Sequence, residues 1–273
     1  MPFKLGFTAD KAEVDLLFPT LPSEDTEPIP PRPCLVRVYF PDRDAAYTYY
    51  NDAFALQKGD LVYVEGKLEG LKGRVADLQY SFKIKLSDYK RVIHRIDTAV
   101  SGTYHMAGSH LVTFDPDALP PKKALLWFKA PDENPDDIIS GQDESSFLLS
   151  DLKAMDITHA IAERGHAYYV NNRVRYLHLN GTRGYALVEG SKTYEVEFTY
   201  QNGEIRNLLC NCFCVGHCKH GFAAMLQLRE LLDWLEENRP AEHKEAPCFT
   251  AIAKNAFFSF AVSGKEAGTI TLG

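Results

Sequence analysis

The 273-residue sequence contains no apolar run that approaches the roughly 20 residues needed to span a bilayer, which argues against a transmembrane helix. Its first residues, MPFKLGFTADKAEVDLLF, hold no apolar signal core followed by a small-residue cleavage site. The net charge of −7 argues against a protein that coats nucleic acid over its whole surface, although it leaves room for a local basic site. These features predict a cytoplasmic protein with no membrane contact.

Motifs of common enzyme classes are also missing. The chain has no GxxxxGK[ST] phosphate loop and therefore no ATPase motor, and it has no GxSxG nucleophile elbow. The glycines in GKLEGLKGR do not follow the dinucleotide-binding pattern. The sequence therefore predicts a protein that is not an enzyme and has no evident small-molecule substrate.

Cysteine is scarce and unevenly placed. Four of the six cysteines fall in the nine residues CNCFCVGHC, and only Cys34 and Cys248 lie elsewhere. A disulfide framework spreads its cysteines so that bridges close loops between distant segments, which clustered cysteines cannot do. In a reducing compartment, metal binding is the first interpretation of clustered thiols.

The cysteine cluster predicts one structural zinc site. Cys210 and Cys212 can bring two sulfurs onto one ion, and Cys218 and His220 repeat the same spacing before a helix. Three thiolates and one imidazole satisfy the tetrahedral preference of Zn²⁺. Because four protein ligands leave no position for water, the predicted site is structural rather than catalytic.

Two neighbouring residues compete for the same ion. Cys214 forms a second Cys-x-Cys pair with Cys212, which would leave three residues before Cys218 instead of five. A connection of three residues would strain the turn into the helix, so we favour Cys210, while replacement of Cys210 by Cys214 stays open. His217 is a further candidate, but the Cys-Lys-His spacing favours His220.

The pattern Cys-x-Cys, a short spacer and Cys-Lys-His before a helix resembles the SWIM zinc-finger family. Upstream segments ERGHAYYVNNRV, YALVEGSKTYEVEF and QNGEI match the strands that precede the metal in that family, so the resemblance covers about residues 160–230. It implies a zinc module that binds either nucleic acid, with DNA our first choice, or a protein partner. In the second case the chain would be an adaptor, for example for a separately encoded helicase-type ATPase.

The first half of the chain predicts a tail, a small barrel and a connector. Residues 1–33 end in the acidic, proline-rich LPSEDTEPIPPRP, which is typical of a tail or linker. Residues 34–98 contain short strands (CLVRVYF, AYTYY, KGDLVYVEG, GRVADLQY and SFKIKL) separated by turn formers, which predicts a small β-barrel. The stretch 34–97 resembles SH3-like small barrels. Residues 99–147 are read as an acidic connector of partial order, although HLVTF and ALLWFKA could be strands.

The second half predicts an antiparallel meander and a helix, so the whole chain is assigned to the α+β class. Within residues 148–240, the SWIM-type module, a helix is expected from Leu148 to about Gly165. AYYV, RVRYLHL, GYALVEG and YEVEFTY follow as strands, with QNGE as the clearest hairpin turn. GFAAMLQLRELLDWLEENR is a strongly amphipathic helix, and residues 241–273 form a C-terminal β segment of two or three strands, among them FFSFAVS.

One basic cluster is a candidate nucleic-acid site. Between residues 58 and 95 the chain carries nine Lys or Arg and five Asp or Glu. Aromatic residues lie among them, so the segment could hold a phosphate backbone and stack bases. The alternative is an ordinary mixed-charge surface over a core of aromatic residues. The candidate contact residues are Lys83, Lys85, Lys90, Arg91 and Arg95.

Overall fold

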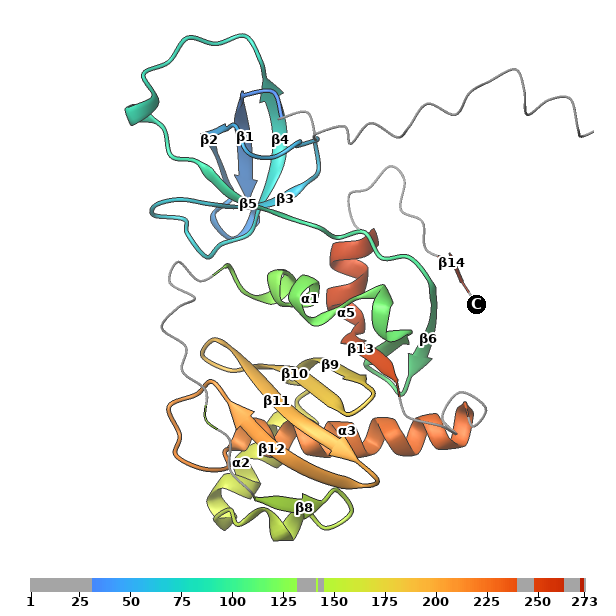
Figure 1. Ribbon diagram of the computed structural model, residues 1–273. Helices are drawn as coiled ribbons and strands as arrows, with labels where there is room; N and C mark the ends of the chain where they lie inside the picture. Colours follow the sequence, from blue (N-terminus) through green and yellow to red (C-terminus); the bar gives the residue numbers. More distant parts are fainter. Residues whose placement is uncertain (1–30, 132–140, 142–144, 240–247, 263–270, 273) are drawn as a thin grey trace, which may run out of the picture.

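Two largely antiparallel sheets form the framework of the protein (Figure 1). The computed structural model describes residues 31–131, 141, 145–239, 248–262 and 271–272. One sheet has five strands from the first part of the chain, and the other has nine strands from the remainder. The predicted α+β class is confirmed. Most of the predicted tail, residues 1–30, lies outside the described residues.

The small sheet is built from short runs of alternating apolar residues. In β1 (Cys34–Phe40), buried and exposed side chains alternate from Val36 onward, as expected for a strand with one covered face. The strand order is β2-β1-β4-β3-β5. The remaining strands are β2 (Ala45–Asn51), β3 (Leu61–Val64), β4 (Gly73–Gln79) and β5 (Val92–Ile96).

The predicted barrel does not close among the described residues. The outer strands β2 and β5 meet only at an isolated bridge between Tyr50 and Arg91. The predicted strand SFKIKL is also wrong, since this segment is a loop that leads into the short 3-10 helix η2 (Leu86–Asp88). The β-branched run VIHRI forms the fifth strand instead, because it pairs with β3 and places Val92 and Ile96 in the core.

The large sheet joins segments that are far apart in the sequence. Its order is β14-β6-β7-β13-β9-β10-β11-β12-β8, and only the β14–β6 pair is parallel. The hairpin between β11 and β12 turns at Asn202 and Gly203, which both have positive φ, as the QNG motif predicts. The strands are β6 (Thr103–Ala107), β7 (Leu111–Phe114), β8 (Ser146–Leu148), β9 (Val174–Asn180), β10 (Arg183–Glu189), β11 (Thr193–Gln201), β12 (Glu204–Cys210), β13 (Phe249–Ala253) and β14 (Thr271–Leu272).

Residues 99–147, expected to be an acidic connector, contribute β6, β7, η3 (Pro116–Ala118), α1 (Pro121–Phe128) and most of β8. β7 pairs with β13, so Val112 lies opposite Ile252, and both side chains are fully buried. The acidic residues that suggested a connector include those of 132–140 and 142–144, which lie outside the described residues. The apolar runs on either side of them belong to the core.

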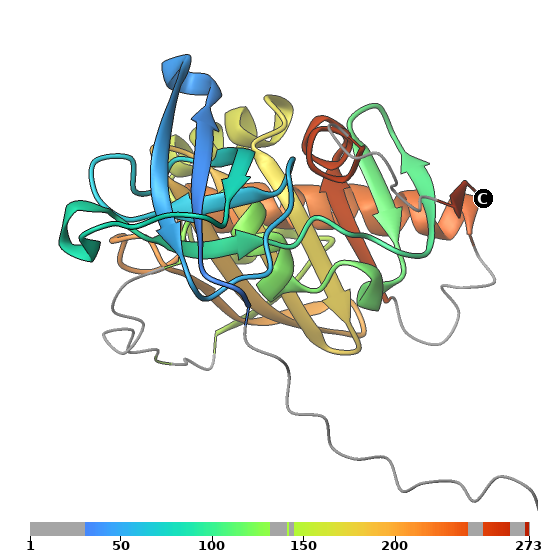
Figure 2. The ribbon, with the colours of Figure 1, turned by 90° about the horizontal axis from the view of Figure 1, so that it is seen from above.

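Helices cover both faces of the large sheet. α2 (His159–Val170) and α3 (Lys219–Asn238) pack together on the face away from the small sheet, as Figure 1 shows. α1 and α5 (Lys254–Phe257) lie between the two sheets, and α5 runs beside β6 in the view of Figure 2. The amphipathic helix predicted from GFAAMLQLRELLDWLEENR is confirmed as α3. No described helix combines the length and apolar composition required to cross a membrane.

Two helix boundaries differ from the sequence prediction. The segment after Leu148 forms the 3-10 helix η5 (Leu152–Met155), and α2 begins only after Thr158, whose side chain caps Ile161 N. Gly165 lies inside α2 rather than at its end. A glycine is required at this position because a Cβ would stand 2.8 Å from Phe222 Cδ1 of α3. The predicted strand AYYV is helical, since it forms the last turn of α2.

The C-terminal segment is only partly extended. CFTAIAK contains β13, but the described part of the predicted strand FFSFAVS, which is FFSFAV, forms the end of α5 and the π-helix η6 (Phe258–Val262). Phe257 is fully buried beside Tyr104 and Phe114, with ring centroids 5.4 and 5.0 Å away. A helical turn brings this ring against the sheet. Residues 241–247 and 263–270 lie outside the described residues.

One apolar core continues from the small sheet into the large one. Tyr63 and Ile96 from the small sheet pack in the same cluster as Trp127, Val112 and Tyr176. Trp127 Nε1 donates to Asp97 O at 2.8 Å, and Tyr63 Oη donates to Leu126 O at 3.0 Å. α1 therefore connects the two sheets through apolar packing and partly buried hydrogen bonds.

Candidate metal centre

The four predicted ligands converge where β12 ends and α3 begins. Cys210 closes β12, Cys212 lies in the following loop, Cys218 is the N-cap of α3 and His220 is in its first turn. One ligand atom from each residue lies within 4.8 Å of all the others. Cys218 and His220 are buried, and the other two are partly exposed. The structure thus confirms that these four side chains are close enough to hold one metal ion.

The separations suit a tetrahedral ion. His220 Nδ1 lies 3.7 Å from Cys210 Sγ and 3.8 Å from Cys218 Sγ. In a tetrahedral zinc site, a sulfur and a nitrogen bound to the same ion are about 3.6 Å apart. Nδ1 is therefore the imidazole atom that faces the sulfurs.

Backbone amides support each of the three sulfurs. Gly221 N donates to Cys218 Sγ at 3.5 Å. The amide of Cys212 donates to the sulfur of Cys210, and the amide of Cys214 donates to the sulfur of Cys212. Such donors favour the thiolate form of cysteine, which is the form that binds metal.

The three sulfurs of the cluster shift one another's pKa values. A hydrogen bond from Cys210 lowers the pKa of Cys218 to about 3, and the same contact raises the pKa of Cys210 far above its usual value. Burial raises the pKa of Cys212 to about 11. Three adjacent thiolates repel one another, and a divalent ion bound among them would offset that repulsion.

Aromatic rings hold the His220 imidazole in place. The ring stacks on Tyr194 of β11 with a centroid distance of 3.9 Å and meets the edge of Tyr168 of α2 at 5.4 Å. His220 Nε2 is buried and has no hydrogen-bond partner among the described residues. Stacking therefore orients this ring, in place of the second hydrogen bond that metal-bound histidines commonly make.

The loop between Cys210 and Cys218, here called the metal loop, is joined to the neighbouring strand β11 by Asn211. Its backbone N donates to Glu195 O at 3.1 Å, and Glu195 N donates to Asn211 Oδ1 at 2.9 Å. Asn211 Nδ2 also donates to Glu195 Oε1 at 3.2 Å. These bonds fix the residue between two candidate ligands, so the site is preorganised before an ion binds.

Asn211→Ala should weaken metal binding by about 10- to 100-fold, because it removes both side-chain bonds to Glu195 while it leaves all four ligands intact. Competition with a chromophoric chelator measures the affinity. Asn238→Ala at the far end of α3, which removes a bond to Trp234 O, is the matched control and should leave the affinity unchanged. Equal affinities for the Asn211 variant and the wild type would contradict the anchoring role.

Neither competing residue joins the cluster. Cys214 is exposed, and its backbone amide serves Cys212 as a donor. His217 packs its ring against Phe147 of β8, with centroids 5.8 Å apart. The flanking Phe213 is 93% exposed, and Val215 is fully exposed. The loop thus presents an apolar tip to solvent, a feature that the sequence analysis did not predict.

The five predicted nucleic-acid contacts do not form one uniform basic face. Arg91 Nη1 pairs with Asp52 at 3.1 Å, and Arg95 Nε pairs with Asp60 at 3.1 Å. Lys83, Lys85 and Lys90 are exposed along the loop before β5. Carboxylates in the loops beside β2 and β3 thus neutralise part of the local positive charge.

Two other lysines lie beside the metal cluster. Lys219 Nζ stands over the Tyr168 ring at 4.8 Å, and Lys192 Nζ over the Tyr194 ring at 5.6 Å. Sequence reasoning did not single out these tyrosines. The signal for Tyr194 was its alternation with Val196 and Phe198, which places all three on the face of β11 that meets α3.

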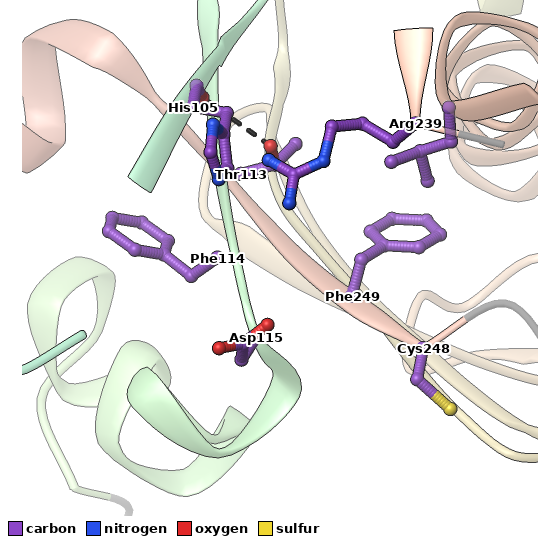
Figure 3. A pocket seen from close by; sticks show the side chains of 8 residues that line it. His105, Thr113, Phe114, Asp115, Arg239, Cys248 and Phe249 are labelled. Atoms are coloured by element: carbon purple, nitrogen blue, oxygen red, sulfur yellow. Dashed lines mark hydrogen bonds between the residues drawn. The ribbon is translucent and has the colours of Figure 1, made fainter. Parts of the chain in front are cut away.

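A separate pocket between β6, β7, β13 and the end of α3 contains a cysteine and a histidine (Figure 3). Its lining includes His105, Asp115 and Cys248. Figure 3 shows the Cys248 side chain pointing away from His105, so the two are not paired as nucleophile and base. Thr113 Oγ1 donates to His105 O at 3.4 Å, which is a structural contact within the β6–β7 hairpin.

Comparisons with known proteins place the chain in no group: no family model, no curated protein and no solved structure matches it. The likeness to the SWIM family therefore rests on the ligand spacing and the strands around it.

Proposed function

We propose that Cys210, Cys212, Cys218 and His220 bind a single structural Zn²⁺ ion. The observation that carries the proposal is the closed donor set, in which four atoms of zinc-preferred type lie within 4.8 Å of one another. Four protein ligands leave no coordination position for water, so the ion would stabilise the junction of β12 and α3 rather than catalyse a reaction.

We further propose that the zinc-stabilised module belongs to a non-enzymatic protein that binds nucleic acid, with DNA the first candidate. The SWIM-like spacing supports this, as do the lysines beside the cluster. Lys192 and Lys219 have no carboxylate within ion-pair distance among the described residues, and Lys83, Lys85 and Lys90 add exposed charge on the small sheet. Lysine ammonium groups of this kind neutralise phosphates.

The test is DNA binding by fluorescence anisotropy over a range of salt concentrations. We expect an affinity that falls steeply with salt, and a double variant Lys192→Ala/Lys219→Ala whose log–log slope is smaller by about 2, one unit for each lost phosphate contact. The control double variant Lys122→Ala/Lys153→Ala removes equal charge from exposed positions in α1 and η5. Absence of binding at low salt, or equal slopes for both variants, would contradict the proposal.

The second candidate is a protein-interaction adaptor, favoured by the exposed apolar tip of the metal loop. Phe213 and Val215 are almost or fully exposed, and contiguous exposed apolar surface marks protein contacts. In that case affinity purification should recover a stoichiometric partner that resists nuclease treatment. The double variant Phe213→Ser/Val215→Ser should lose it while keeping the metal.

A further inference from the structure

A second polar pocket lies where the small sheet, α1, the large sheet and the C-terminal helical segment meet, and none of its lining residues is a candidate metal ligand. It has a volume of about 370 Å³, within the range of small-molecule sites. The lining residues that concern its chemistry are Lys72, Arg175, Glu189, Thr193, Asn255 and Phe260. They come from five separate segments, so only the folded chain assembles them.

Lys72 places an ammonium group in this pocket without a carboxylate partner. Its Nζ donates to Trp127 O at 2.6 Å and stands 4.6 Å from the centroid of the Phe260 ring. No described carboxylate lies within ion-pair distance of it. Burial lowers the pKa of Lys72 to about 8, so the surroundings do not fully compensate its positive charge.

Arg175 supplies a second cation with unused donor capacity. Its Nη2 donates to Asn255 Oδ1 at 2.9 Å. Its Nε lies 3.4 Å from Glu189 Oε2 but makes no aligned hydrogen bond and is buried. Because a guanidinium carries five N–H donors, one bond and one distant contact leave most of them available.

The charges around the pocket do not balance. Glu189 is shared, since its other oxygen pairs with Arg173 Nη1 at 3.0 Å. The charged neighbours that act on Lys72 are Asp42, Arg175 and Glu189. With Arg173 and Lys72 itself there are three cations and two carboxylates, an excess of one positive charge. A singly charged anion would neutralise it.

We propose that this pocket binds an oxyanion, a phosphate or carboxylate group of a small molecule, between the Lys72 ammonium and the Arg175 guanidinium. The guanidinium offers parallel donors to two oxygens, and the ammonium acts as a point charge beside them. The Phe260 ring and the apolar part of the lining would contact the rest of the ligand. This site shares no residue with the candidate metal ligands or with the two lysines beside them.

The experiment is a titration of the full-length, metal-loaded protein with inorganic phosphate and, separately, with acetate at constant ionic strength. The backbone amide signals of Thr193 and Asn255 are followed by NMR. We expect saturable shifts with a dissociation constant of about 1 mM for at least one of the two anions. Tighter binding of phosphate identifies a phosphorylated ligand, and tighter binding of acetate identifies a carboxylate.

Two variants and a control distinguish binding in the pocket from diffuse attraction to the surface. Lys72→Met, which keeps the aliphatic stem, should weaken binding by about tenfold, the effect of one charge-assisted bond. Lys58→Met removes the same charge from an exposed ion pair with Asp77 and should leave the constant within about twofold. If Lys72→Met does not fold, Arg175→Lys, which keeps the charge but loses the planar donors, should weaken binding instead.

Shifts that stay linear up to about 20 mM of both anions would overturn the proposal, since such binding is weaker than a built site provides. Equal weakening by Lys58→Met and Lys72→Met would also overturn it, because it would show diffuse attraction to the surface. Neither result bears on the zinc proposal, as zinc content is measured separately on the same samples.

Discussion

Removal of the metal is expected to destabilise the junction of β12 and α3 and to lower the stability of the whole protein. A ligand that binds only the folded state adds about 4 kcal/mol when its free concentration is 1,000 times its dissociation constant. Cys210→Ser should have the same effect, because Cys210 contacts both Cys218 and His220 in the centre of the cluster. Elemental analysis of the purified protein should find one zinc per wild-type chain. A chelator should lower the thermal midpoint.

Cys214→Ser is the matched control for Cys210→Ser. Cys214 is exposed, and the cluster uses its backbone amide, which serine retains. This variant should keep one zinc per chain and the wild-type midpoint. The reverse pattern, with zinc kept by Cys210→Ser and lost by Cys214→Ser, would assign the ion to the 212/214 pair and contradict the geometry of the cluster.

Trp127→Ala should destabilise the protein by about 3–5 kcal/mol, the usual cost of removing a large ring from a filled core. Trp127 is fully buried in the cluster shared by the two sheets. The substitution also removes the donor to Asp97 O, which lies directly after β5. Urea unfolding followed by circular dichroism measures the free energy of unfolding.

Trp234→Ala on α3 is the control for Trp127→Ala. Trp234 is only partly buried and packs at the margin of the other large core cluster, so its loss should cost clearly less. If the two sheets unfold together, Trp127→Ala shifts one cooperative transition. A loss below about 0.5 kcal/mol would contradict the idea that Trp127 connects the sheets, because surface substitutions have effects of that size.

The small sheet contributes side chains to a core that it shares with the large sheet, which its own sequence does not indicate. Tyr63 and Ile96 lie on the face of the small sheet that meets α1, and their neighbours there come from β7, β9 and α1. A segment of this size alone buries little apolar surface. Packing against the large sheet supplies the missing contacts, and the same junction creates the polar pocket at Lys72 and Arg175.

Features that depend on near neighbours in the chain could be predicted from the sequence. The spacing of Cys210, Cys212, Cys218 and His220 brings four donors together because only a short loop separates β12 from α3. Alternation in CLVRVYF predicts β1, and helical periodicity in GFAAMLQLRELLDWLEENR predicts α3. The Asn202–Gly203 turn follows from the ability of these residues to adopt positive φ.

Features that depend on distant partners were decided by the tertiary structure. The sequence gives HLVTF only as a possible strand and gives no strand at β6, because the partner that places β7 in the large sheet, β13, comes more than 130 residues later. AYYV has the composition of a strand, yet it is helical because Gly165 lets α2 approach α3 closely. The Tyr194–His220 stack and the Lys72–Arg175 pocket likewise need strands and helices that only folding brings into contact. Local sequence sets backbone preference and ligand spacing, whereas burial, which supplies most of the folding free energy, depends on which segments meet.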